Sequence, residues 1–306
     1  MDAANYTHSK INPSFSKTVK DLNEKIIRRG DLPHISVKNL LKIVEDLCSF
    51  PLGKFFLERK GANGFWTDYI INHPNKKTNI NSAGKSFSHT EHFILNKCPL
   101  SIATQERFKI FQSNIQKYLK DKMILASIPC GMMRDLLTLD FSNLSTFSII
   151  GVDLDRQSLS LARKLAEEKK LKKHTKLIQV DAWNLTIEYE IDLITSNGLN
   201  VYIPDSQQVI NLYKKFYSLL KKGGILIIGV LTHPPENAAQ SEWIMDDLPF
   251  DDVLMEKILF QDILESKWQN FRTSNEIYRD FYDAGFSDIQ IIYDKHRIFP
   301  TVIATK

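Results

Sequence analysis

The spacing of apolar residues divides the chain into two regions. From Val37 to Leu57 apolar residues recur at helical spacing with a break at Pro51, and GFWTDYIINHP is a second such segment, closed by Pro74. Helical spacing returns from about 102 to 119, after an Asn- and Ser-rich loop over 75–89. We therefore predict a helical N-terminal region over residues 1–119, which we interpret as a substrate lid. Its first 20 or so residues are polar and predict a mobile tail.

After residue 120 short apolar runs alternate with helical patterns. MILASI, FSIIGV, KLIQV, IDLIT and GILIIGVL have the length and composition of parallel strands buried on both faces. Asp155 is placed to cap the helix after the second run, and QQVINLYKKFYSLLKKGG predicts a helix that ends in a tight turn. The last two runs, SDIQIIYD and TVIATK, predict a hairpin. We predict a doubly wound α/β domain over 120–306, with a cap insertion at about 233–273.

Composition limits the classes of protein and of partner that the sequence allows. The chain has 306 residues, 43% of them hydrophobic, enough for a large core, and its net charge of +4 favours neither nucleic acid nor an anionic partner. Cys48, Cys98 and Cys130 lack the spacing of a disulfide framework or a zinc site, so no metal is expected. Neither a signal-peptide core nor an apolar run of about 20 residues is present, so we expect a soluble, cytoplasmic protein without a membrane span.

The residues that follow the predicted strands are the candidates for ligand binding, because ligands of open parallel sheets lie beyond the carboxyl ends of the strands. Gly131 follows the first strand and is either a turn glycine or a point of close approach to a ligand. Asp153 lies 22 residues further on, near the spacing at which a carboxylate meets ribose hydroxyls, whereas Asp155 is better explained as a helix cap. Asp181 and Trp183 follow the third strand and suit either an adenine or an ordinary strand end.

These strand ends together resemble a known family. The series ILASIPCG, GVDLDRQSLSLAR, VDAWNL, YEIDLITSNGLN, LLKKGGILIIGVL and FYDAGF is similar to the motifs of class I S-adenosylmethionine-dependent methyltransferases, over about residues 120–306. The resemblance implies a Rossmann-like sheet of seven strands, mainly parallel with an antiparallel terminal hairpin strand, and S-adenosylmethionine as cofactor. The candidate cofactor-binding residues are Ser127, Pro129, Cys130, Gly131, Asp153, Leu154, Asp181, Ala182, Trp183, Ser196, Asn197 and Gly198.

The resemblance also implies a part for each strand end. The loop at Cys130 and Gly131 would contact the amino-acid part of the cofactor, and Asp153 would bind its ribose. Asp181 and Ala182 would hold the adenine, and residues 196–198 would form the floor near the sulfonium.

The first loop departs from the family pattern. Ser127 stands where an acid is usual, and Pro129 and Met133 stand at usual glycine positions. Because a serine supplies no charge, contact with the cofactor's ammonium would weaken or pass to another acid. Met132 and Met133 are expected to pack beneath the first helix.

The expected reaction is methyl transfer to the oxygen or nitrogen of a small-molecule acceptor, by proximity in a capped pocket. His233 and Tyr202 are candidate catalytic residues, although a surface histidine and a core tyrosine explain them equally well. Phe65, Trp66, Tyr69 and His73 would form an aromatic wall or simply helical core.

Nucleic acid is disfavoured as the acceptor. SNGLN replaces the loop expected for base-amine methylation, no cysteine is placed for base-carbon chemistry, and the lysine-rich run 169–176 is typical of a solvated surface. The alternatives are a non-catalytic scaffold with a methyltransferase-like domain and an RNA or protein methyltransferase.

Overall fold

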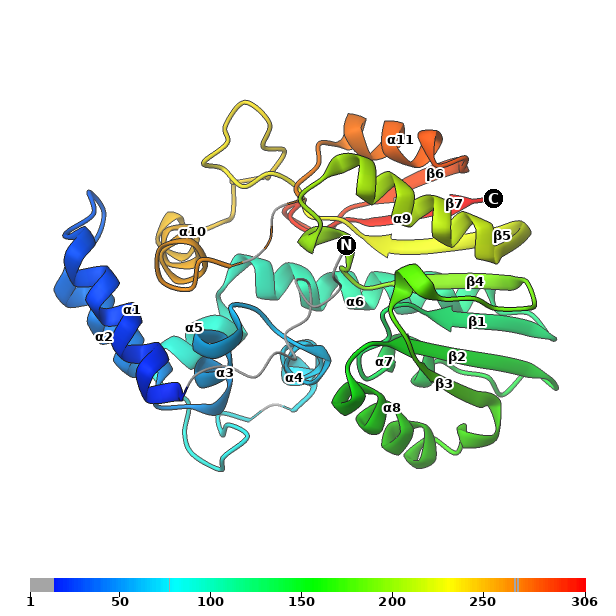
Figure 1. Ribbon diagram of the computed structural model, residues 1–306, viewed down its shortest axis with the longest axis horizontal. Coiled ribbons are helices and arrows are strands. Elements are labelled where there is room, and N and C mark those ends of the chain that lie inside the picture. Colours follow the sequence, from blue (N-terminus) through cyan, green and yellow to red (C-terminus); the bar gives the residue numbers. More distant parts are fainter. Residues whose placement is uncertain (1–13, 77, 267, 269) are drawn as a thin grey trace. The chain divides into compact units, whose positions relative to one another are not determined.

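The computed structural model describes residues 14–306 except 77, 267 and 269, and they form two compact units (Figure 1). The α/β unit contains 103–244 and 268–306, and the helical unit contains 14–102 and 245–266. The division falls within helix α6 (Pro99–Tyr118). The insertion expected at 233–273 is thus shared between the two units, with 245–266 grouped among the N-terminal helices.

The helical unit is built from short amphipathic helices. They are α1 (Phe15–Arg29), α2 (Val37–Leu47), α3 (Pro51–Arg59), α4 (Gly64–Lys76), α5 (His89–Asn96) and α10 (Phe250–Lys257), which continues as a π-helical turn, Ile258–Ile263. Pro51 occupies the first turn of α3, where its missing N–H costs nothing, so the predicted break is confirmed.

Two details of the helical region differ from the sequence-based expectation. Residues 1–13 of the predicted tail lie outside the described residues, but α1 begins at Phe15, within the 20 residues assigned to that tail. Only Ile26 of α1 is buried, and the helix is polar on average, so its sequence has the composition of a polar tail. The second difference is that α4 runs two residues past Pro74, to Lys76.

The α/β unit contains a seven-stranded sheet in the order β3-β2-β1-β4-β5-β7-β6. The strands are β1 (Met123–Ser127), β2 (Phe147–Asp153), β3 (Thr175–Gln179), β4 (Ile191–Ser196), β5 (Leu220–Gly229), β6 (Ser287–Ile292) and β7 (Thr301–Thr305). Pairings from β3 through β5 are parallel, whereas β7 is antiparallel to both β5 and β6. The predicted doubly wound sheet with its antiparallel terminal hairpin strand is confirmed.

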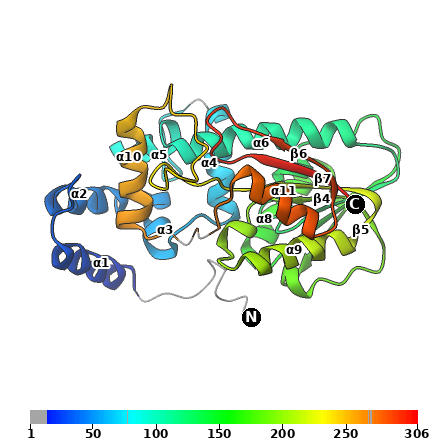
Figure 2. The ribbon, with the colours of Figure 1, turned by 90° about the horizontal axis from the view of Figure 1, so that it is seen from above.

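Successive residues of each central strand enter two different hydrophobic clusters. Leu125 and Ile149 pack on the face covered by α6, α7 (Arg134–Leu137) and α8 (Arg156–Glu168). Their neighbours Ala126 and Ile150 pack on the face covered by α9 (Ser206–Leu219) and α11 (Ser274–Asp283). Figure 2 shows α6 and α9 on opposite sides of the strands. Burial on both faces explains why the strands are continuous apolar runs in the sequence.

The strand order reverses at the centre of the sheet, and this reversal locates the site. From β1 the chain moves outward through β2 and β3, then returns to place β4 on the other side of β1. The helix after β1 and the helix after β4 cover opposite faces. In sheets of this kind ligands bind beyond the carboxyl ends of the two strands at the reversal, here β1 and β4.

The described residues contain neither a membrane-spanning helix nor a cluster of metal-ligating side chains. None of the helices in the described part of the chain has the length and apolar content required to cross a bilayer. Within the same residues, no group of three or more His, Cys, Asp or Glu side chains is arranged to hold a metal ion.

Replacing Gly53 with alanine should destabilise the protein. An added Cβ would lie 2.3 Å from the backbone oxygen of Leu47, which no side-chain motion relieves. Alanine gains about 1 kcal/mol of helix propensity over glycine, but overpacking of a core costs about 1–3 kcal/mol, more when backbone must move. We therefore expect Gly53→Ala to lower the free energy of unfolding in urea. Lys54→Ala, at an exposed position of the same helix, is the control; an unchanged or higher stability of Gly53→Ala would contradict the packing argument.

Candidate active site

Gly131 and Asp153 meet at the carboxyl ends of β1 and β2. The N–H of Gly131, which has a left-handed φ of 50°, donates to Oδ2 of Asp153 at 2.8 Å, and the N–H of Asp155 donates to Oδ1 at 2.9 Å. A carboxylate oxygen is able to accept two hydrogen bonds, so Oδ1 and Oδ2 each keep an acceptor position for a ligand. Burial raises the pKa of Asp153, and hydrogen bonds from the backbone N–H groups of Asp155, Gly131 and Leu154 oppose that rise. The carboxylate is placed to accept a pair of vicinal hydroxyls.

The side chains of Cys130 and Met133 turn away from this edge and fill the core beside Gly151. A Cβ on Gly151 would lie 2.7 Å from Sδ of Met133 and 3.1 Å from Sγ of Cys130. Burial raises the pKa of the Cys130 thiol well above its usual value, so the thiol is neutral. The expectation that Met133 packs inside is confirmed. Cys130 contributes backbone to the loop, and its N–H donates to Val152.

The end of β3 offers a carboxylate beside an aromatic ring. Asp181 caps the short turn Ala182–Asn184 by accepting the N–H of Trp183 at 3.1 Å. Trp183 is partly buried against the main cluster, and Ala182 is buried. Leu154 is 40% exposed beyond the end of β2. These residues leave an acid and apolar surface at the strand ends, which suits a purine base.

Ser127 is completely buried at the end of β1 and donates to Oδ2 of Asp135 at 3.0 Å. Thr195 of β4 donates to the same oxygen at 2.6 Å, and Nδ2 of Asn197 donates at 3.0 Å. Asp135 lies in α7 and is 3% exposed. Burial raises its pKa, and the hydrogen bonds oppose this rise.

Asp135 is not among the candidate residues predicted from the sequence. Its position in the first turn after the loop, together with the absence of an acid at position 127, could have drawn attention to it. However, the sequence does not show in which direction α7 points this side chain.

Arg107 of α6 lies next to this group. Its Nη1 donates to Oδ1 of Asn197 at 2.8 Å, and its guanidinium stacks between the rings of Phe111 and Phe299, 4.9 and 4.2 Å from their centroids. Burial lowers the pKa of Arg107 to about 10, while Asp135 and Asp294 act in the opposite direction, so it remains a cation at neutral pH. The Asn197 amide therefore joins a buried cation to the Asp135 carboxylate. Sequence reasoning missed Arg107, because it precedes the first strand.

The buried hydroxyl of Ser196 shows whether the strand ends have a polar group left over for a ligand. It is completely buried at the end of β4, and its Oγ has no hydrogen-bond partner among the described residues. Gly198 follows with a φ of 105°, a conformation that favours glycine. An unpaired buried hydroxyl costs free energy unless a ligand or water satisfies it. Together with the Asp135, Asp153 and Asp181 carboxylates, this hydroxyl fits a ligand with an ammonium group, a ribose and a purine.

The two candidate catalytic residues lie in different surroundings. Tyr202 follows β4, its hydroxyl accepts from Nε1 of Trp268 at 3.4 Å, and burial raises its pKa, so at neutral pH it is a phenol and not a base. His233 follows β5, and its Nε2 lies 3.8 Å from Oε2 of Glu276. Burial lowers the pKa of His233, so its imidazole is neutral at pH 7. Only His233 has the protonation state of a base.

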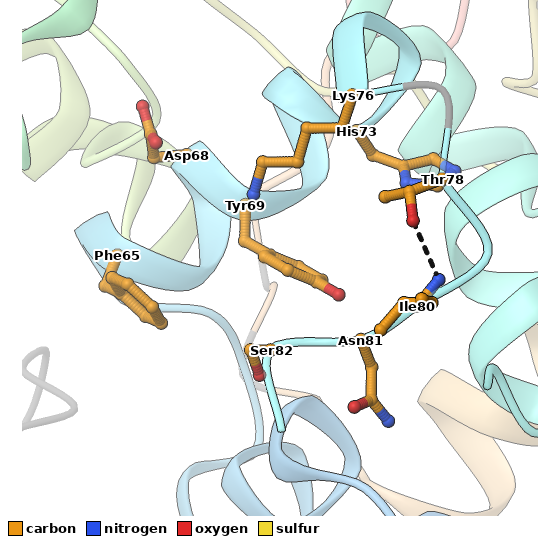
Figure 3. A pocket seen from close by; sticks show the side chains of 9 residues that line it. All are labelled: Phe65, Asp68, Tyr69, His73, Lys76, Thr78, Ile80, Asn81 and Ser82. Carbon is orange, nitrogen blue, oxygen red and sulfur yellow. Dashed lines mark hydrogen bonds between the residues drawn. The ribbon is translucent and has the colours of Figure 1, made fainter. Parts of the chain in front are cut away.

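The helical unit has a pocket of about 160 Å³ of its own, bounded by α4 and the loop that follows it (Figure 3). It is lined by Phe65, Asp68, Tyr69, His73, Lys76, Thr78, Ile80, Asn81 and Ser82. Of the four aromatic-wall candidates, Trp66 is buried in the core and does not line the pocket. His73 is held by Asn96 through Nε2 at 2.9 Å, and Lys76 lies 4.7 Å from the centroid of the Tyr69 ring.

Comparisons with known proteins show the family to which the chain belongs. Residues 119–276 match the methyltransferase domain family. A protein from Bordetella parapertussis, described as a possible exported protein, is 31% identical, with 97% of this chain and 99% of that chain covered and a TM-score of 0.89. No curated protein matches the sequence.

A more distant structure shares the fold. Magnesium protoporphyrin IX methyltransferase from Synechocystis PCC 6803, with bound SAH, is 12% identical, with 79% of this chain and 94% of that chain covered and a TM-score of 0.52. The chain belongs to the class I S-adenosylmethionine-dependent methyltransferases. It is therefore an enzyme of this family, with S-adenosylmethionine as its cofactor.

The pKa of His233 should lie below 6.5, and Glu276→Gln should lower it further, since Glu276 raises it. Because the folded state binds this proton more weakly than the unfolded chain, the contribution of His233 to stability is complete above pH 6.5 and falls at lower pH. Glutamine keeps the capping box of α11, so the fold should persist. Titration of the His233 ring by NMR measures both values; a midpoint above 6.5, or an increase in Glu276→Gln, would contradict this assignment.

Proposed function

We propose that the protein transfers a methyl group from S-adenosylmethionine to an oxygen or nitrogen of a small-molecule acceptor. The observation behind the proposal is the convergence of Gly131, Asp153 and Asn197 at the ends of β1, β2 and β4, respectively, around the reversal of strand order. The bound cofactor supplies an electrophilic methyl group on a sulfonium. The chain has to bind this cofactor, align the acceptor and exclude water.

Each strand end has a proposed part in cofactor binding. The Asp153 carboxylate accepts the ribose hydroxyls, supported by the acceptor position that each of its oxygens keeps. Asp181 accepts the amino group of the adenine, with Leu154, Ala182 and Trp183 as its apolar surroundings. The backbone of residues 129–131 borders the amino-acid part, and residues 196–198 lie beneath the sulfonium. Ser127 acts indirectly, through Asp135.

His233 and Tyr202 are proposed to act on the acceptor. A neutral imidazole after β5 is able to take a proton from a hydroxyl or an amine as the methyl group is transferred. Tyr202, a buried phenol after β4, donates or accepts a hydrogen bond without changing its charge. Both follow strands that neighbour each other in the sheet.

A small acceptor is supported by the pocket of the helical unit, whose volume suits a single ring or a short chain. Phe65 and Tyr69 offer aromatic surface there, while Asp68 and Lys76 offer charge. We infer that the helical unit serves as the substrate lid.

The lysine run at 169–176 gives little support to a nucleic-acid acceptor. Its lysines are exposed, and Lys172 pairs with Glu167 at 2.7 Å. The run follows α8, which returns from the carboxyl end of β2 to the amino end of β3. A helix of 13 residues is about 20 Å long, so the run lies at the opposite edge of the sheet from Asp153.

A cytoplasmic location is also a proposal. It is supported by Cys48, Cys98 and Cys130, which are free thiols, as expected in a reducing compartment. The description of the Bordetella parapertussis relative as a possible exported protein makes fractionation of cells the appropriate test.

S-adenosylmethionine should bind to the purified protein in isothermal titration calorimetry, and Asp153→Asn should weaken binding at least about tenfold, because an amide forms fewer and weaker hydrogen bonds to a diol. Asp121→Asn, at an exposed position of the same unit, is the control. Absence of binding to the wild type at millimolar cofactor would contradict the enzyme proposal. Unchanged affinity in a folded Asp153→Asn variant would contradict only the ribose assignment.

The acceptor should be found among small molecules. Incubation with methyl-labelled S-adenosylmethionine and a fractionated cell extract should label a component that passes a small-pore filter, and Phe65→Ala should raise the KM for it without changing cofactor affinity. Lys85→Ala, exposed in the same unit, is the matched control. Label found only in RNA or protein, with salt-dependent binding of that macromolecule, would replace the small-molecule proposal.

A further inference from the structure

We propose that Asp135 supplies the negative charge that meets the ammonium group of the cofactor's amino-acid part, in place of an acid at the end of β1. This inference rests on the proposed function, since it concerns binding of S-adenosylmethionine. It assigns the charge to α7, a helix that follows the loop, whereas Ser127 on the strand acts only by positioning the carboxylate.

The Asp135 carboxylate lies between the ends of β1 and β4. Its Oδ2 accepts hydrogen bonds from Ser127 at the end of β1 and from Thr195 near the end of β4, at 3.0 and 2.6 Å. These are the two strands at which the order of the sheet reverses. A ligand of this fold is expected at that point, so Asp135 is a buried carboxylate at the binding crevice.

The buried charges around Asp135 do not balance. The three side chains that donate to Asp135 are neutral, and no ion pair with it is found in the described part of the chain. Arg107 reaches it through the Asn197 amide and also interacts with Asp294. The Asp294 carboxylate is itself satisfied by the N–H groups of His296, Ile298 and Phe299.

Two buried carboxylates thus share one buried guanidinium, which leaves one negative charge without a cation of its own. A buried charge is costly unless it is paired. An ammonium group from a ligand provides that partner.

The serine on β1 agrees with this assignment. The Ser127 hydroxyl lies 3.0 Å from the Asp135 carboxylate, so an acid at position 127 would place two like charges together in the interior. Serine at 127 and aspartate at 135 are therefore compatible, whereas two acids are not. At the end of β1 the site thus has one carboxylate, that of Asp135 in α7, and the hydroxyl of Ser127 orients it.

The experiment compares two ligands on two proteins. S-adenosylhomocysteine carries the ammonium group, and its deamino analogue, with hydrogen in place of the ammonium, keeps the rest of the molecule. On the wild type, calorimetry should show at least about tenfold weaker binding of the deamino analogue, as expected for loss of a charge-assisted hydrogen bond. Asp135→Asn should weaken S-adenosylhomocysteine by a similar factor but leave the affinity for the deamino analogue within about twofold.

Two further variants make the result specific. Asp140→Asn, an exposed acid after the same helix, should leave both affinities unchanged. Ser127→Asp combined with Asp135→Asn moves the charge back to β1 and should restore part of the lost affinity for S-adenosylhomocysteine. This rescue would not be expected if Asp135 only stabilised the fold.

Several results would overturn the inference. Equal binding of the two ligands by the wild type would do so even if Asp135→Asn failed to fold. Equal loss of both ligands in a folded Asp135→Asn variant would show a structural role instead. Failure of the wild type to bind S-adenosylhomocysteine at all would contradict the proposed function itself, which is a distinct outcome.

Discussion

The hydrogen bonds from Ser127, Thr195 and Asn197 to the Asp135 carboxylate join the two central strands to the helix that follows the first of them. The rest of the site depends on this group. It holds α7 over the end of β1, and with α7 it places the loop whose Gly131 is bonded to Asp153 on β2. Two carboxylates therefore connect the three neighbouring strand ends: Asp135 joins β1 to β4, and Asp153 joins the loop after β1 to β2.

The interior supplies three neutral hydrogen-bond donors to the buried Asp135 carboxylate. Arg107 contacts the group through the Asn197 amide, and its guanidinium lies 4.9 and 4.2 Å from the ring centroids of Phe111 and Phe299. Gly229 leaves room for it, since a Cβ there would lie 3.0 Å from Nη1 of Arg107. The polar centre and the apolar layers around it are thus packed together. In a low-dielectric interior such a network is favourable only when its members are satisfied.

Much of the α/β unit could be predicted from local sequence. Continuous apolar runs such as IDLIT indicate strands buried on both faces, and the helices between them require a parallel sheet, as observed. The helical unit was less predictable. Helix α1 is polar on average and buries only Ile26, and α5 is only eight residues long, so neither was recognised from the sequence. The grouping of 245–266 with helices far away in the sequence depends on non-local packing.

Some residues of the candidate site could be predicted from the sequence and others could not. Asp153 and Asp181 could be chosen from the sequence because each directly follows a strand, and the strand ends of a parallel sheet share one edge. The sequence did not indicate that the side chain of Cys130 turns into the core. It also did not indicate that Asp135 and Arg107 belong to the site. The sequence by itself determined the fold class, the sheet edge proposed to bind the cofactor and the presence of serine at position 127, because these follow from local pattern and position. Only the tertiary structure decided which carboxylate lies at that edge, because that depends on where α6 and α7 direct their side chains.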